Sequence, residues 1–214
     1  MKHIVKGPAP TELEEFKDNF RIINHREPMY KDFRETDAWR HLREILLGEQ
    51  GYICCYCMQG IEDWDSHLEH FTPRVDGKLH PHSILSDHIE LEYSNLFMSC
   101  NGETSSPREH CGHKKDDTQT AMLVCPTDDD VEGQFSYTIN GKIDGITPKA
   151  MTTIRVLGLD SYALERHRKT AIYEVIKELN DSDIDMLIHK YECRDARGMF
   201  TPYCKAITYC LRHI

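Results

Sequence analysis

The chain has 214 residues, an ordinary apolar content of 39% and a formal net charge of −10. This length suffices for one well-buried domain, and the mixture of apolar residues with charges of both signs excludes a disordered protein. No apolar run approaches the roughly 20 residues that a membrane span needs. Residues 1–16 also lack the apolar core of a signal peptide, so we expect a cytoplasmic protein without membrane contact.

The acidic charge argues against unaided binding to nucleic acid. Affinity for a phosphate backbone comes largely from Lys and Arg, and the chain has 26 of these against 36 Asp and Glu. A nucleic-acid enzyme with this composition therefore needs a local concentration of basic residues or a partner that delivers its substrate.

Residues 1–50 predict a helical segment. Thr11 and Glu14 have the spacing of a capping box, and apolar residues recur behind them at helical intervals. A second helix is predicted from about 37 to 47, with Gly48 ending it. We interpret both helices as packing elements.

Residues 51–120 lose the helical period and form a second unit. The run YICCYCMQG predicts a strand that enters a metal-binding turn, and HLEHF alternates as a short strand that Pro73 closes. The run DGKLHPHSILSDH predicts a long loop, YSNLFMSC a second short strand, and GHKKDDTQTAML a helix. The predicted order is strand, loop, strand and helix.

Residues 121–214 predict a hairpin followed by helices. Alternating residues flank the turn pair Asn140-Gly141 between 135 and 146. Residues typical of helix starts are Pro148, Ser161, Ser182 and Thr201, and Gly158 is placed to end the first of these helices.

Nine cysteines are many for a cytoplasmic protein of this size. Their odd number and uneven spacing argue against a disulfide framework, and metal binding is the next explanation. The histidines agree, since 7 of the 13 lie between His67 and His113, interleaved with cysteines.

Four of the cysteines predict a zinc site. Cys54 and Cys57 have the spacing at which two thiolates of one turn bind a single tetrahedral zinc ion. Cys100 and Cys111 complete the set, because the ten residues between them are polar and loop-like.

Other assignments of the cysteines remain open at this point. Cys55 is an alternative to Cys54, and His110 is an alternative to Cys111. The other cysteines are predicted to be small buried apolar residues: Cys125, Cys193, Cys204 and Cys210.

Between these cysteines and just after them lie residues suited to phosphodiester hydrolysis. Glu69 and His70 are adjacent, and Asn95 and His113 follow. The reaction needs a base that takes a proton from water and a hard cation that neutralises charge on the phosphate. A carboxylate and an imidazole suit a divalent cation, a second neutral imidazole suits the base, and an amide can orient that base.

The arrangement CCYC, LEHFTPR, YSNLFMSC and CGHKK, over residues 51–117, resembles the zinc-containing HNH endonucleases, whose core is a ββα-metal fold. The flanking runs FSYTINGKIDG and TTIRVLGLDSYALERHRK resemble the PtuB-type HNH proteins of Septu and retron anti-phage systems. The resemblance implies an α+β fold, with a small zinc-stapled ββα-metal core embedded in a mainly helical domain.

The resemblance also implies a role for each site residue. His70 is the general base, Asn95 orients it, and Glu69 with His113 binds a catalytic Mg²⁺ or Mn²⁺. Many relatives have Asp where this chain has Glu69, and the choice between His110 and His113 as the metal ligand stays open. The structural Zn²⁺ falls to Cys54, Cys57, Cys100 and Cys111.

The surroundings of this site suggest how a substrate is held. His67 lies two residues before Glu69 and can share the active face. Arg74, Lys114 and Lys115 are candidate contacts to the nucleic-acid backbone.

Resemblance to the PtuB-type proteins implies a partner, a PtuA-like ABC- or SMC-type ATPase. In a retron system a reverse transcriptase with its msDNA would join it. The helices after Pro148 are the candidate docking layer. The sequence leaves open whether the substrate is DNA or an RNA such as tRNA.

Two rival classes remain. A non-catalytic zinc module that docks helices onto a partner in a defence complex predicts bound metal without cleavage. A thiol redox protein that uses Cys54 and Cys57 predicts no bound zinc.

Overall fold

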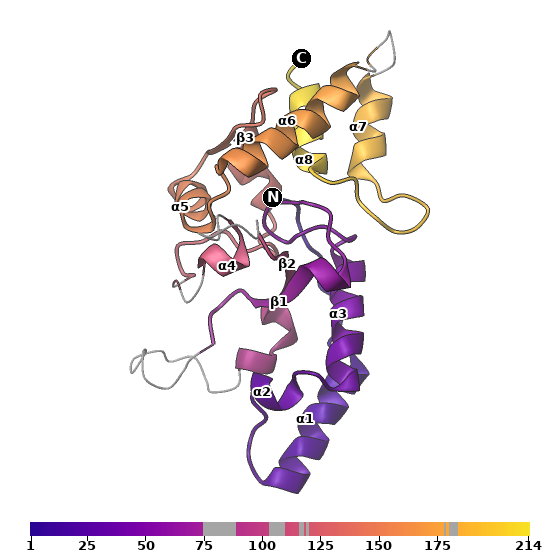
Figure 1. The fold of residues 1–214 in the computed structure, drawn as a ribbon, viewed down its shortest axis with the longest axis vertical. Coiled ribbons are helices and arrows are strands. Elements are labelled where there is room, and N and C mark those ends of the chain that lie inside the picture. Colours follow the sequence, from indigo (N-terminus) through magenta and orange to yellow (C-terminus); the bar gives the residue numbers. More distant parts are fainter. Residues whose placement is uncertain (75–88, 103–109, 116–117, 119, 178, 180–183) are drawn as a thin grey trace.

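The structure is a computed structural model that describes residues 1–74, 89–102, 110–115, 118, 120–177, 179 and 184–214. It is a mixed helix-and-strand protein. The first three helices and the last four lie at opposite ends, and a small two-stranded sheet lies between them (Figure 1). The long loop predicted over residues 76–88 lies entirely outside the described residues.

Three helices make up the N-terminal end. Thr36 begins the third of them, because its side chain accepts a hydrogen bond from the Trp39 amide. The first helix starts directly after Pro10 and has no side-chain cap, so the capping box predicted at Thr11 is wrong. The helices are α1 (Thr11–Asn24), α2 (Tyr30–Phe33) and α3 (Asp37–Glu49).

The central sheet pairs β1 (Ser66–His70) with β2 (Leu96–Cys100) in antiparallel order, so that His70 faces Leu96. Gln50, at the end of α3, bonds both the amide and the carbonyl of Met98 through its side chain. This contact fixes β2 against the N-terminal helices.

A helix follows the sheet, as predicted, but it is shorter than the predicted helix. Helix α4 (Gly112–Lys115) has four residues, and the helix predicted to continue to residue 123 is too long, because residues 118 and 120–123 are described and are not helical. The order of strand, strand and helix is nevertheless observed in the described residues.

The C-terminal half begins with the predicted hairpin, and the Asn140-Gly141 pair lies in its turn. Thr147 caps the next helix through the Ala150 amide, and Gly158 ends it with a left-handed conformation, as expected. The last helix begins later than the predicted start at Thr201. The strands and helices are β3 (Phe135–Tyr137), β4 (Ile143–Gly145), α5 (Pro148–Leu157), α6 (Tyr162–Lys177), α7 (Ile184–Glu192) and α8 (Cys204–Leu211).

Four short 3₁₀ helices connect these elements in the described chain. They span Asp63–Asp65, Ile89–Leu91, Tyr93–Asn95 and Val131–Gln134.

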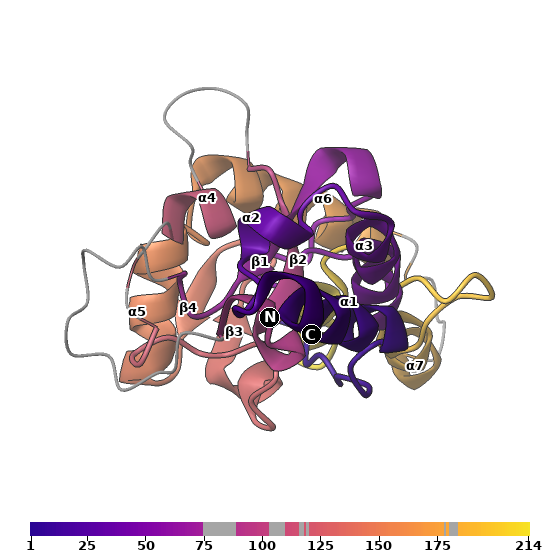
Figure 2. The ribbon, with the colours of Figure 1, turned by 90° about the horizontal axis from the view of Figure 1, so that it is seen from below.

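One continuous buried cluster joins the two ends through the centre. It runs from Leu13 and Phe33, through Leu96 of β2, to Leu164 and Ile207 of the C-terminal helices. Figure 2 shows the central strands surrounded by helices when the molecule is viewed from below. The division into segments 1–50, 51–120 and 121–214 stays a prediction. In the described part of the chain, no helix is both long and apolar enough to span a membrane.

Candidate functional site

The four cysteines predicted to bind zinc come together and are buried. Their sulfur atoms all lie within 4.8 Å of one another. Cys54 Sγ is 3.8 Å from Cys111 Sγ, and Cys57 Sγ is 3.7 Å from Cys100 Sγ. Thiolates bound to a tetrahedral zinc ion at about 2.3 Å are about 3.8 Å apart, so the cluster fits such an ion.

A tight turn presents the first two of these cysteines. The Met58 amide donates to the Cys54 carbonyl at 3.1 Å, and the Gln59 amide points at Cys57 Sγ at 3.4 Å. Cys111 is held from another direction, since its amide donates to the Leu157 carbonyl at the end of α5. The site therefore connects the turn after α3 to the C-terminal helices.

The two alternative ligands lie beside the cluster and are not part of the four. Cys55 is buried, and its amide bonds the Met98 carbonyl; burial raises the pKa of its thiol well above the usual range. His110 Nδ1 lies 3.2 Å from Cys111 Sγ, so His110 accompanies Cys111 without replacing it. Among the described residues, the geometry favours the four cysteines alone.

The prediction for the remaining cysteines is half right. Cys204 and Cys210 are buried in α8, as expected. Cys125 is only partly buried and Cys193 is exposed, because Cys193 follows the end of α7 at the surface.

Glu69 is the centre of a second polar cluster. Its Oε1 accepts hydrogen bonds from Tyr56 and from Lys115 Nζ, each at 3.0 Å. Burial raises the pKa of the Glu69 carboxyl, but the hydrogen bond with His67 and the charge of Lys115 outweigh it and lower the pKa below its usual value. Glu69 is therefore ionised at neutral pH.

His67 and His113 lie on the same side as Glu69. Residues two apart in a strand share one face, so His67 and Glu69 both point toward α4. A Cβ atom at Gly112 would lie 2.5 Å from Glu69 Oε2 and 2.6 Å from His67 Nε2, so only glycine permits this approach. The ring of His113 stacks on that of His67, with centroids 4.1 Å apart.

His70 projects from the other face of β1, and its imidazole is neutral at physiological pH. Its ring packs edge-on against Tyr30, and Nε2 lies 2.9 Å from the Glu90 carbonyl oxygen. A carbonyl only accepts hydrogen bonds, so Nε2 carries the proton and Nδ1 keeps a free lone pair. Burial, together with the charge of Arg74, lowers the pKa of His70 to about 4.

Asn95 acts on the backbone just beyond His70. Its Oδ1 accepts from the Thr72 amide at 2.7 Å, and its Nδ2 donates to the Thr72 carbonyl at 3.0 Å. The ring nitrogen of His70 is bonded by the Glu90 carbonyl. Asn95 therefore fixes the chain at the end of β1, two residues after His70.

The three predicted phosphate contacts do not share one environment. Arg74 and Lys114 are exposed, and the Arg74 guanidinium lies over the Tyr30 ring. Lys115 is 2% exposed, and its Nζ bonds the carbonyls of His70 and Phe71 at 2.9 and 3.1 Å. The structure thus points Lys115 inward, where its charge pairs with Glu69.

Because Lys115 is buried and Lys114 is exposed, we expect their replacement to change the stability of the protein by different amounts. Replacing Lys115 with methionine leaves the Glu69 carboxylate buried without its cation and should cost about 3–5 kcal/mol of unfolding free energy. Lys114→Met, at the exposed neighbouring position, should change stability by less than about 0.5 kcal/mol. Denaturant unfolding of the two zinc-loaded variants measures both values. Equal stability of the two variants would contradict the structural role of Lys115.

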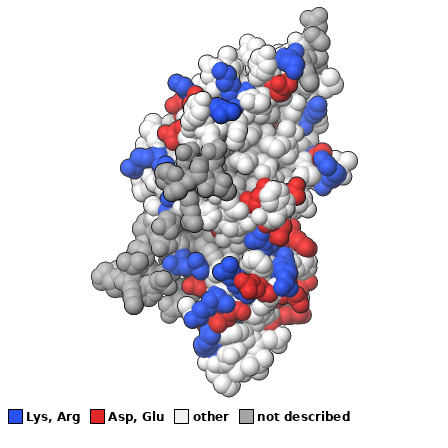
Figure 3. Space-filling view, in the orientation of Figure 1, with Lys and Arg blue, Asp and Glu red and all other residues white. Residues whose placement is uncertain are grey.

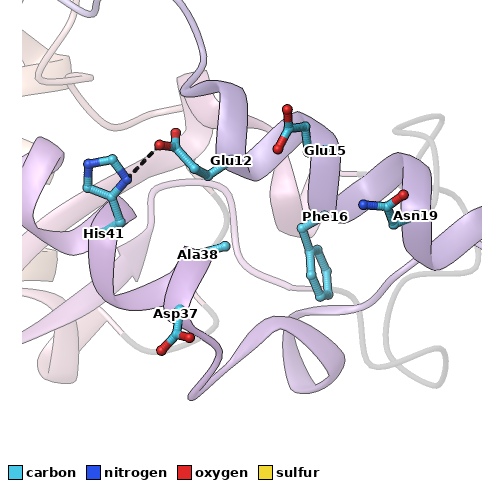
Figure 4. A pocket seen from close by; sticks show the side chains of 7 residues that line it. All are labelled: Glu12, Glu15, Phe16, Asn19, Asp37, Ala38 and His41. Atoms are coloured by element: carbon cyan, nitrogen blue, oxygen red, sulfur yellow. Dashed lines mark ion pairs between the residues drawn. The ribbon is translucent and has the colours of Figure 1, made fainter.

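A separate open pocket lies between α1 and α3 and holds none of the candidate site residues. Its volume is about 370 Å³, and Figure 4 shows Glu12, Glu15 and Asp37 around it, with Glu12 paired to His41. Carboxylates of this kind repel phosphate, so the pocket does not extend the candidate active site.

Comparisons with known proteins add one finding. No family model matches the chain. The chain is 28% identical over 178 residues to a protein of Vibrio cholerae serotype O1 biovar El Tor, the "Retron Vc95 putative HNH endonuclease". The similarity covers 78% of this chain and 80% of that protein. It supports the resemblance to the HNH endonucleases that the motifs indicate.

Proposed function

We propose that the chain is an HNH-type endonuclease that hydrolyses phosphodiester bonds of DNA or RNA with a divalent cation. The observation that carries the proposal is the end of β1. There an ionised carboxylate, Glu69, and a neutral imidazole, His70, project from opposite faces of two consecutive strand residues, and Nδ1 of His70 can accept a proton. The similarity to the Vibrio cholerae protein described above supports it.

Glu69 and His113 are the residues that would hold the catalytic cation, Mg²⁺ or Mn²⁺. When bound, the ion supplies positive charge to the scissile phosphate and the leaving oxygen. Lys115 and Tyr56 occupy Oε1 of Glu69 and thereby fix the direction of Oε2, which faces α4.

His70 provides the proton transfer in this proposal. Its Nδ1 takes a proton from the attacking water, and the ring gains a positive charge beside the phosphate. The Glu90 carbonyl holds Nε2–H and so keeps Nδ1 as the accepting atom. Asn95, by clamping Thr72, keeps the end of β1 in place during this transfer.

A cleavage assay separates the candidate classes. The zinc-loaded protein, offered plasmid, phage DNA and total tRNA with Mg²⁺ or Mn²⁺, should cut at least one of these substrates. A non-catalytic zinc module would bind zinc and cut none of them. A thiol redox protein would hold no zinc, and the close approach of four buried sulfur atoms disfavours that class.

The charge of the molecule supports recruitment by a partner. On the face drawn in Figure 3, Lys and Arg lie interspersed with Asp and Glu. The formal charge of −10 further disfavours a free encounter with nucleic acid. We therefore include in the proposal a PtuA-like ABC- or SMC-type ATPase that docks on the helices after Pro148. The name of the relative contains the word retron. We propose that in a retron system a reverse transcriptase with its msDNA joins the complex.

This part of the proposal predicts a strong effect of the partner. The isolated chain should bind DNA or RNA weakly at physiological salt, and the complex with the co-expressed ATPase should associate roughly 10–10³-fold faster. Filter binding and cleavage rates of the chain with and without the ATPase test this. Tight, salt-sensitive binding with fast turnover by the isolated chain would show that it needs no partner.

A further inference from the structure

Tyr30 of α2 is connected to the proposed base by two separate contacts. Its ring packs edge-on against the imidazole of His70, with centroids 4.9 Å apart and an angle of 86° between the planes. Its backbone amide donates to Oε2 of Glu90 at 2.7 Å. The carbonyl of the same glutamate accepts a hydrogen bond from His70 Nε2 at 2.9 Å. Tyr30 thus contacts the imidazole directly and also holds the residue that bonds it.

One hydrogen bond does not fix the orientation of an imidazole. The torsion about the Cβ–Cγ bond of histidine is broad, so a ring held only at Nε2 can swing and change the direction of the Nδ1 lone pair. An edge-on aromatic neighbour supplies the missing restraint, because ring pairs with centroids about 4.5–7 Å apart favour this geometry. The contact between Tyr30 and His70 lies in this range, so it restricts the plane of the imidazole.

The surrounding chain holds Tyr30 itself in place. Trp39 of α3 donates through its indole Nε1 to the Tyr30 hydroxyl at 3.3 Å. The guanidinium of Arg74 lies over the face of the Tyr30 ring, 5.0 Å from its centroid, at a distance typical of a cation–π contact. The ring is therefore held at its hydroxyl by α3 and at its face by the chain that follows β1. An N-terminal helix that the sequence suggests only as a packing element is connected to the candidate base in this way.

We propose that Tyr30 is a positioning residue for the base of this site. Its ring sets the plane of the His70 imidazole, and its amide fixes Glu90, whose carbonyl keeps Nδ1 as the accepting nitrogen. The segment from α2 to α3 is then part of the active site and not only of the core. This inference rests on the proposed nuclease function and adds to it a residue that the motifs do not contain.

The first test compares Tyr30→Leu with Tyr30→Phe in the zinc-loaded full chain. Leucine removes the aromatic ring, whereas phenylalanine keeps the ring and loses only the hydroxyl that Trp39 bonds. Single-turnover cleavage by Tyr30→Leu should be roughly 10–10²-fold slower at saturating substrate, with little change in KM, because misplaced reacting groups cost rates of this size. Tyr30→Phe should cleave at nearly the wild-type rate. Tyr173→Leu, which removes an exposed ring of α6, is the matched control and should leave the rate unchanged.

A second pair of variants tests the contact through Glu90 and serves if Tyr30→Leu does not fold. Glu90→Ala removes the acceptor of the Tyr30 amide but keeps the backbone carbonyl that bonds His70, and it should lower the cleavage rate. Glu90→Gln keeps an accepting oxygen at the same place and should restore most of the rate. An equal loss of rate in both variants would assign the effect to the charge of Glu90 and overturn the role of the Tyr30 amide.

Nuclear magnetic resonance of the His70 ring gives a readout that does not depend on cleavage. In zinc-loaded protein with isotope-labelled histidine at neutral pH, the ring signals that His70→Gln removes identify this residue. The wild type and Tyr30→Phe should show a single tautomer of His70, protonated at Nε2. Tyr30→Leu should show the averaged nitrogen signals of a ring that exchanges between tautomers.

The two readouts separate a failure of this inference from a failure of the nuclease proposal. A single Nε2-protonated tautomer of His70 in Tyr30→Leu would overturn the role of Tyr30, even if the wild type cleaves nucleic acid. Averaged His70 signals in Tyr30→Leu, with a wild type that cuts no substrate, would support the role of Tyr30 and contradict the nuclease function alone.

Discussion

Replacing His70 with alanine is expected to lower the rate of phosphodiester cleavage by about 10²–10⁴-fold, the usual contribution of a general base. The physical reason is the free Nδ1 lone pair, which the Glu90 carbonyl maintains and which alanine lacks. Zinc content should not change, because His70 is not among the four clustered cysteines. Single-turnover cleavage by the purified variant, with zinc measured on the same sample, gives both quantities.

Two further variants test whether the loss of rate comes from the missing base and not from lost packing. His70→Gln fills more of the buried space beside Tyr30 than alanine does, so a rate as low as that of His70→Ala separates lost proton transfer from lost packing. Asn95→Ala should have a milder effect, since the Glu90 contact to the ring remains. Cleavage by His70→Ala at nearly the wild-type rate would remove His70 from the mechanism.

Replacing Cys57 with serine should abolish the bound zinc and with it much of the fold. The central sheet has only two strands of five residues each, and the cysteine turn connects both ends of the molecule to it. Structural zinc contributes about 10–16 kcal/mol of apparent binding free energy in small zinc domains, which exceeds the stability of most domains. We expect one zinc per wild-type chain, little or none in Cys57→Ser, and loss of cooperative thermal unfolding in that variant.

The other cysteines supply the controls for this experiment. Cys193→Ser changes an exposed side chain and should keep both zinc and the melting temperature. Cys55→Ser changes a buried thiol next to the cluster and should keep the zinc, with at most a moderate loss of stability. The assignment would be wrong if Cys57→Ser and Cys100→Ser proteins both retained one zinc and melted normally.

Several elements follow from residues close together in the sequence. The Thr147-Pro148 start and the Gly158 end of α5 are as predicted, because caps act within one helical turn. The Asn140-Gly141 turn is equally local, and the Gly141 carbonyl also accepts a bond from buried Arg168. The cap of α1 was predicted wrongly. The sequence predicted a capping box at Thr11, but Pro10 is the N-cap and Thr11 is the first residue of the helix.

The candidate site, too, could be predicted only in part from the sequence. Adjacent Glu69 and His70, the Cys54 and Cys57 spacing and the order of strand, strand and helix are all visible in the sequence. The choice of Cys54 over Cys55 and of Cys111 over His110 depends on where four sulfur atoms meet in space. No spacing rule contains that information, because the last pair approaches from a different part of the chain.

The direction of side chains is what only the tertiary structure decided. Sequence proximity to the site suggested that Lys115 faces a phosphate, yet the carbonyls at the end of β1 and the Glu69 carboxylate draw its ammonium inward. The Glu90 carbonyl, 20 residues from His70, sets which imidazole nitrogen is free. In a buried site, a polar group bonds those groups that the packing of the chain brings within about 3 Å of it. The sequence therefore determined which chemical groups this protein has, and packing determined which of them face one another.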